Sequence, residues 1–154
     1  MRQKHTLIIG LGDQHHGDDA LSFLITSKIK ERLPKKLKVV NGTGSCSSLV
    51  RLLKQADSAV VIDAVHTGAK PGTIFRLDAA HDPIPTDLFG SCKHDKGIHK
   101  ALETLHACHK SPSHLVIYGI EAKKPEPGDH LSRTAKKAAE EVQELALHEF
   151  LGEV

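Results

Sequence analysis

The amino-acid sequence predicts an α/β protein, a three-layer αβα sandwich around a mostly parallel sheet with one antiparallel edge strand. Short apolar runs, such as residues 6–9 and 59–62, are typical of strands that are covered on both faces. Helix-length segments with apolar residues on one side separate these runs. Because strands and helices alternate, the strands are expected to lie parallel, with helices on both faces of the sheet.

The composition excludes several classes of protein. A chain of 154 residues is expected to form one domain, residues 1–154, with a real core. The net charge is only +2 and aromatic residues make up 3%, so a nucleic-acid partner is not expected. The apolar run near the N-terminus is too short for a signal peptide or a membrane span, which predicts a cytoplasmic protein without a membrane partner. The three cysteines lack paired metal spacing and are expected to be reduced thiols.

The first half of the chain is expected to contain three buried strands, at residues 6–9, 37–40 and 59–62. A helix is expected over residues 18–33, because apolar residues recur at every fourth position and Pro34 ends the pattern. A Gly/Ser-rich turn follows the second strand, and Ser47 or Ser48 in it can cap a short helix. The third strand is expected to end at Asp63.

The second half begins with a Lys-Pro-Gly turn at residues 70–72. The turn precedes a strand at 73–77, which is close enough to its predecessor to suggest a hairpin-like edge. Another strand is expected at 115–118, ahead of a loop at 121–129, and Ser132 is expected to cap the last helix. The two helices of this half have apolar sides formed by Ile98, Ala101, Leu102 and Leu105, and by Ala135, Ala138, Ala139, Val142, Leu145 and Ala146.

Ligands of open parallel sheets bind at the carboxyl ends of the strands. In this sequence, acidic residues and a histidine are expected at that edge. Asp18 and Asp19 follow the first strand, Asp63 ends the third, and His94 precedes a helix on the same edge. Two carboxylates and an imidazole would suit nickel or zinc and leave positions open for an outside ligand. Structural roles are the alternative: Asp18 can cap its helix with Asp19 in the first turn, Asp63 can cap a loop, and His94 can simply precede Asp95 as a cap.

Four segments occur in the order and at the separations that are found in the hydrogenase maturation proteases, a family that this sequence resembles over most of its length. The segments are LIIGLGDQHHGDDALSF, VVIDAVHTGAKPGTIFRL, SCKHDKGIHKAL and YGIEAKKPEPGDHLS. The residues that match the family's motifs are Gly10, Gly12, Asp13, Asp18 and Asp19, then Ile62, Asp63, Ala64, Pro71 and Gly72, then Ser91 and His94, and finally Leu131 and Ser132.

Departures from the family's pattern lie in the first segment. Asp13 stands where the family usually has asparagine, and Asp19 where many members have glutamate, which keeps the charge but shortens the reach. His15 and His16 replace positions that are commonly apolar. These two histidines can add ligands, contact a substrate or be solvated loop residues.

The resemblance implies an endopeptidase that removes a C-terminal extension from the precursor of a nickel-iron hydrogenase large subunit after nickel insertion. It also implies that Asp19, Asp63 and His94 bind the metal, and that the nickel arrives with the precursor. The metal would polarise the scissile carbonyl and activate water, and Asp19 or Asp63 would take the proton as the catalytic base. We expect substrate choice in the exposed loops at 67–70, 81–90 and 123–130, in which no residue forms a recognisable specificity code.

Nucleotide binding is one competing interpretation, because Gly10 and Gly12 lie between a strand and a helix. The dinucleotide fingerprint needs a third glycine where His15 stands, and Gly17 comes too late. Two acids at the helix start would also repel a pyrophosphate.

A non-catalytic nickel-binding protein or chaperone of hydrogenase assembly is the second alternative, suggested by twelve histidines. Most of these, for example His106, His109, His114 and His148, are expected on helices or polar turns without a shared spacing. A serine or cysteine hydrolase is not supported, because the Gly-x-Ser-x-Gly elbow is absent and the cysteines have no predicted base partner beyond His94, which lies near Cys92.

Overall fold

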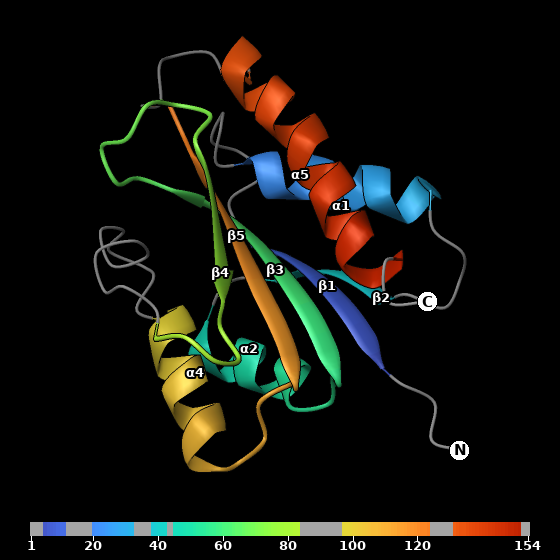
Figure 1. The fold of residues 1–154 in the computed structure, drawn as a ribbon, viewed down its shortest axis with the longest axis vertical. Helices are drawn as coiled ribbons and strands as arrows, with labels where there is room; N and C mark the ends of the chain where they lie inside the picture. The colour runs from blue at the N-terminus through green and yellow to red at the C-terminus, as the bar shows by residue number, and fades with distance from the viewer. Residues whose placement is uncertain are drawn as a thin grey trace.

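The central feature of the fold is a five-stranded sheet with the strand order β2-β1-β3-β5-β4 (Figure 1). The computed structural model describes residues 5–11, 20–32, 38–42, 45–83, 97–123 and 131–151. The strands are β1 (Thr6–Leu11), β2 (Lys38–Gly42), β3 (Ser58–Val65), β4 (Ile74–Asp78) and β5 (His114–Glu121). Neighbouring strands are parallel except for β4, which runs antiparallel to β5. The predicted fold class is confirmed.

Two pairs of helices cover the two faces of the sheet (Figure 1). One face carries α1 (Leu21–Arg32) and α5 (Arg133–Leu151), and the other carries α2 (Cys46–Leu53) and α4 (Gly97–Ala107). Each face has its own apolar cluster, so the central strands are buried on both sides, as their continuous apolar runs predict. None of the helices within the described ranges is long and apolar enough to cross a membrane.

The two longest strands extend further than the sequence predicts. β3 continues through Asp63 to Val65, and β5 continues through Gly119 to Glu121. The parallel ladder pairs Asp63 with Gly119 and Val65 with Glu121, so backbone pairing carries both strands past their first polar or glycine residue. The predictions that β3 ends at Asp63 and that Glu121 belongs to a loop were therefore wrong.

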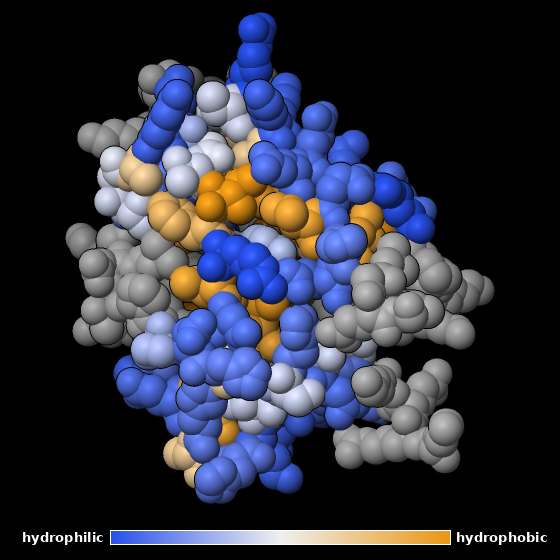
Figure 2. Space-filling model, in the orientation of Figure 1, coloured by the Kyte–Doolittle hydropathy of each residue, from blue (hydrophilic) through white to orange (hydrophobic). Residues whose placement is uncertain are grey.

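The edge strand β4 is antiparallel, as predicted, but it is not in a hairpin with β3. It pairs with β5, for example Leu77 with Ile117, because the β3–β4 connection crosses the end of β5. Gly72 N donates to Glu121 O at 2.9 Å, and Glu121 N donates to Thr73 O at 2.8 Å. Figure 2 shows apolar side chains at the surface around β4, between the hydrophilic outer faces of the neighbouring helices.

The helix caps differ in part from the prediction. Ser45, not Ser47 or Ser48, caps α2: its backbone is extended and its side chain accepts a hydrogen bond from Ser48 N at 3.3 Å. Ser132 caps α5 as predicted, since its hydroxyl accepts from Ala135 N at 3.2 Å. The apolar stripe of α5 was wrong at Leu145, which is 38% exposed, whereas Leu147 is buried in the core.

Candidate active site

Asp63 is a buried carboxylate near the carboxyl edge of the sheet, two residues before the end of β3. Its residue surface is 6% exposed. Because side chains alternate along a strand, Asp63 is directed to the same face as Val61 and Val65, which pack in the cluster beneath α2 and α4. A carboxylate is rarely buried without a specific role, since its desolvation is costly. The structure thus singles out Asp63 as a candidate functional group.

The neighbour of Asp63 on β5 is Gly119, which has no side chain. A Cβ atom at Gly119 would lie 3.0 Å from Val65 Cγ1, so any larger residue would crowd the end of β3. The flank of Asp63 that faces β5 is therefore kept free of a side chain from the paired position. This glycine is needed for packing beside the candidate site.

A second glycine, Gly10, lets α1 lie close to the end of β1. A Cβ atom here would come within 2.7 Å of Thr26 Cγ2. The Thr26 hydroxyl donates to Asn41 Oδ1 at 2.7 Å, and the Ser22 hydroxyl donates to Leu11 O. These contacts fix the start of α1 against the carboxyl ends of β1 and β2, which is the edge that the sequence predicts for the site.

Two of the three predicted metal ligands, Asp19 and His94, lie outside the described residues. The same holds for the neighbouring candidates Asp13, Asp18, His15, His16, Ser91 and Cys92. Within the described ranges, no group of three or more His, Cys, Asp or Glu residues could hold a metal ion. The convergence of Asp19, Asp63 and His94 on one site therefore stays a prediction.

Glu121 is a second buried carboxylate at this edge, and the sequence reasoning missed its role. It is 3% exposed and ends β5. Its carboxylate accepts hydrogen bonds from Thr67 N at 2.9 Å, from Thr67 Oγ1 at 2.6 Å and from Gly68 N at 3.1 Å. Glu121 thereby holds the start of the β3–β4 connection beside the end of β3. The signal for it was an acid that closes an apolar run, the same signal that identified Asp63.

The rest of the β3–β4 connection is also fixed by specific contacts. Thr73 N donates to Lys70 O at 3.1 Å, which confirms the turn predicted at residues 70–72. Gly72 has a φ of 89°, and a Cβ atom there would lie 3.2 Å from Thr134 O at the start of α5. A glycine is required here both by the positive φ and by the approach to α5. The predicted substrate loop at 67–70 thus lies at the carboxyl edge with a defined conformation.

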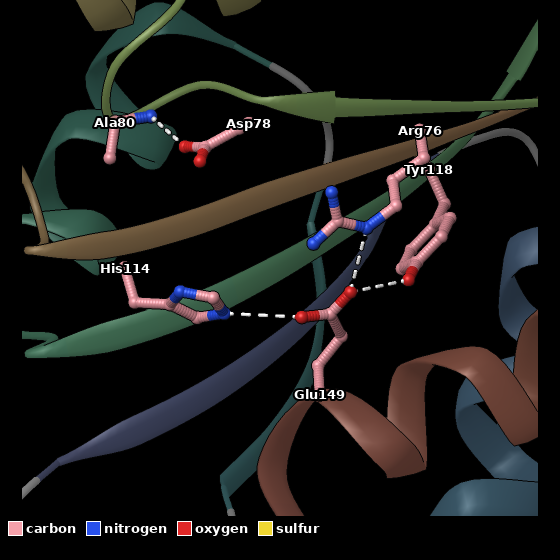
Figure 3. A network of polar contacts seen from close by, with 6 residues as sticks. All are labelled: Arg76, Asp78, Ala80, His114, Tyr118 and Glu149. Carbon is pink, nitrogen blue, oxygen red and sulfur yellow. Dashed lines mark hydrogen bonds and ion pairs between the residues drawn. The ribbon is translucent and has the colours of Figure 1, made fainter. Parts of the chain in front are cut away.

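A third carboxylate, Glu149, organises a polar network away from this edge, where α5 packs on β4 and β5 (Figure 3). Arg76 Nε donates to Glu149 Oε1 at 2.8 Å, and the Tyr118 hydroxyl donates to the same oxygen at 2.7 Å. His114 Nε2 lies 3.3 Å from Glu149 Oε2. His114 is on β5, so its prediction as a helix or turn residue was wrong. The network fastens the C-terminal part of α5 to the sheet.

The network also changes the pKa values of its members. Burial and the hydrogen bond to Glu149 raise the pKa of Tyr118 to about 12. Burial acts to raise the pKa of Glu149, but the hydrogen bonds from Arg76, Tyr118 and His114 outweigh it, and the pKa lies below its ordinary value. The hydrogen bond to Glu149 raises the pKa of Arg76. At neutral pH the network therefore contains an ionised carboxylate, a guanidinium and a neutral phenol.

Comparisons with known proteins agree with this fold. The family model of the hydrogenase maturation proteases, HycI, matches residues 23–149. The hydrogenase expression/formation protein HoxM of Azotobacter vinelandii is 26% identical over 99% of this chain and 75% of its own length.

Solved structures show the same fold. The maturating endopeptidase HybD of Escherichia coli matches with a TM-score of 0.84 at 22% identity, over 97% of this chain and 93% of that chain. The maturation protease HycI of Thermococcus kodakarensis matches with a TM-score of 0.70 at 21% identity, over 93% and 90%. The resemblance seen in the sequence motifs is thus confirmed, and the chain belongs to the hydrogenase maturation protease family.

Proposed function

We propose that this protein is an endopeptidase that removes the C-terminal extension of a nickel-iron hydrogenase large-subunit precursor after nickel has been inserted. The observation that carries the proposal is the buried carboxylate of Asp63, near the carboxyl edge of the sheet, in a chain that belongs to the maturation protease family. Nickel is part of the substrate in this proposal, and the precursor brings it to the site.

The donor set suits this task. Asp63 offers a carboxylate, and Asp19 and His94 are proposed to add a second carboxylate and an imidazole. Oxygen and nitrogen donors of this kind bind divalent transition metals such as nickel. Nickel held by the precursor would polarise the adjacent peptide carbonyl and lower the pKa of a bound water. The protease thus supplies the ligands that complete the site only when a loaded precursor docks.

The proton balance of the cleavage assigns a second role to the carboxylates. Water adds to the carbonyl carbon, and its proton passes to Asp63 or Asp19 acting as the general base. The same proton then passes to the leaving amine as the C–N bond breaks, so the carboxylate is regenerated.

The loop next to Asp63 supports substrate binding in this proposal. Glu121 holds Thr67 and Gly68 in place through four hydrogen bonds from three donor groups, so the loop meets the precursor in a fixed shape. A preformed loop loses less conformational entropy on binding than a mobile one. Glu121 is therefore a positioning residue and takes no part in proton transfer.

The test is an incubation of the protein with a large-subunit precursor from the same cell, with and without nickel, followed by the mass of the precursor. We expect loss of the C-terminal extension only in the nickel-loaded sample. Equal cleavage of both samples would contradict the role of nickel. Stable binding without any cleavage would instead support a chaperone of hydrogenase assembly.

A further inference from the structure

An open groove of about 880 Å³ runs between α2 and α4. Its walls come from one side of α2, from α4 and from the chain that follows α4. The eight residues that line it are Cys46, Ser47, Val50, Arg51, Lys54, Gln55, Thr104 and Lys110. The groove is on the same face of the sheet as the Asp63 side chain, because Asp63 alternates with Val61 and Val65 of the α2/α4 cluster.

The charge of the groove is one-sided. Arg51, Lys54 and Lys110 bring three cations, and none of the eight lining residues is an acid. The chain as a whole has a net charge of only +2, so this groove concentrates positive charge well above the average of the molecule. A groove of this kind attracts an anionic ligand.

The length of the groove sets the size of that ligand. The eight residues of α2 span about 12 Å at the usual rise of an α-helix. An extended peptide covers that length with about four residues. The first turn of α2 follows directly after the end of β2, so the Cys46 end of the groove opens at the carboxyl edge of the sheet. A short peptide in the groove would therefore point toward the edge that holds Asp63.

We propose that this groove binds a short acidic segment of the precursor, away from the bond that is cleaved. The inference depends on the proposed function, because it takes the hydrogenase precursor as the substrate. The groove then contributes to binding and to the rate of encounter, whereas the Asp63 edge performs the reaction. Its contribution must also weaken as salt screens the charges.

The test reverses two of the cations in Arg51→Glu/Lys54→Glu, at positions that are both exposed. We expect KM for the nickel-loaded precursor to rise about tenfold while kcat stays within about twofold, since surface charges act mainly on association. For the unmodified protein we expect KM to rise with salt concentration. In the charge-reversed variant this rise should be smaller. The matched control is Lys28→Glu/Lys30→Glu on α1, which changes the net charge equally on the other face of the sheet.

A milder variant guards against misfolding. Arg51→Gln/Lys54→Gln/Lys110→Gln removes the charges without introducing acids, and we expect the same salt effect with a smaller change in KM. Thermal unfolding of each variant shows whether it is folded. If the folded charge variants keep the KM and the salt dependence of the unmodified protein, the groove proposal is wrong.

Binding experiments separate this proposal from the proposed function. Asp63→Asn should bind the loaded precursor without cleaving it, and a four-residue glutamate peptide should displace the precursor better than a four-residue lysine peptide. If the unmodified protein binds the loaded precursor in a charge-dependent way but never cleaves it, the endopeptidase function is refuted and the groove proposal is supported. Displacement by inorganic phosphate or by an oligonucleotide, with no effect of the glutamate peptide, would overturn the groove.

Discussion

Glu121 and Glu149 both accept several hydrogen bonds through their carboxylates, but Glu121 holds a loop in place and Glu149 holds a helix against the sheet. The donors to Glu121 are the backbone amides of Thr67 and Gly68 and the hydroxyl of Thr67, so Glu121 orders a loop at the carboxyl edge. The donors to Glu149 are the side chains of Arg76, Tyr118 and His114, so Glu149 joins a helix to the sheet. The comparison predicts that loss of Glu121 acts mainly on the proposed cleavage and that loss of Glu149 acts mainly on stability.

Of the two carboxylates compared here, Glu121 is expected to give the larger effect on cleavage when it is replaced, in Glu121→Ala. The loop beside Asp63 loses its acceptor, and displacement of about 1 Å next to reacting groups lowers kcat/KM by about a hundredfold. Steady-state cleavage of the nickel-loaded precursor measures the change, and Glu140→Ala on the exposed side of α5 is the control. An unchanged kcat/KM in folded Glu121→Ala would remove the positioning role.

Glu149→Ala should act on stability instead. The buried Tyr118 hydroxyl loses its acceptor and Arg76 loses its counter-ion, so the free energy of unfolding should fall by about 2 kcal/mol. Urea unfolding measures the change, and kcat/KM at a temperature where the variant is folded should stay within about twofold of the unmodified protein. A large loss of activity without a loss of stability would contradict the division between the two carboxylates.

The pH dependence of stability gives a second test of the Glu149 network. The folded pKa of Tyr118 is about 12, above its ordinary value of 10.0, so the folded state holds this proton more tightly. The stabilisation is present below pH 10 and is lost as the pH rises to 12. Tyr118→Phe should lose less stability over this interval than the unmodified protein. Equal alkaline losses in both proteins would show that the phenol does not titrate as described.

At acidic pH the same network should lose stability as the pH falls, because Glu149 becomes protonated. The pKa of Glu149 is lower in the folded state, so its contribution is complete above the ordinary pKa of 4.5 and is lost as the pH falls through the folded pKa. In Glu149→Gln this acid-dependent loss should be smaller. Unfolding curves recorded from neutral pH downward measure it, and identical acid sensitivity would contradict the assignment.

The smallest effect is expected from an exposed ion pair between α1 and α5, Arg32 with Glu144. The two side chains are 48% and 66% exposed, so water and salt screen their attraction. Glu144→Gln should change the free energy of unfolding by less than about 0.5 kcal/mol. A loss as large as that of Glu149→Ala would mean that burial does not explain the strength of the Glu149 network.

Much of the fold follows from the sequence because it depends on local patterns. Apolar runs mark the strands, and their order with the helices indicates a mostly parallel sheet. The strand ends were harder to predict, since Asp63 and Glu121 look like loop residues until the ladder with the neighbouring strand is known. The β3–β4 connection was misjudged for the same reason, because its partner, β5, lies far along the chain.

In the candidate site, too, local sequence features could be predicted, whereas contacts between distant residues could not. Asp63 could be identified because an acid stands out in an apolar run, and the structure places it in a buried position near the carboxyl edge. The partners of Glu121 and Glu149 could not be predicted, because Thr67 and Arg76 are separated from them by 54 and 73 positions and no periodicity links them. The roles of Asp19 and His94 stay predictions that depend on the family resemblance.

The most direct test of the central claim compares Asp63→Asn with the unmodified protein on the nickel-loaded precursor. Asparagine keeps the size of the side chain but removes the charge and the basic oxygen, so cleavage should slow by at least about a hundredfold while the protein stays folded. Glu140→Gln, at an exposed position on α5, is the matched control and should cleave normally. Precursor mass over time measures both. Normal processing by Asp63→Asn would contradict the account.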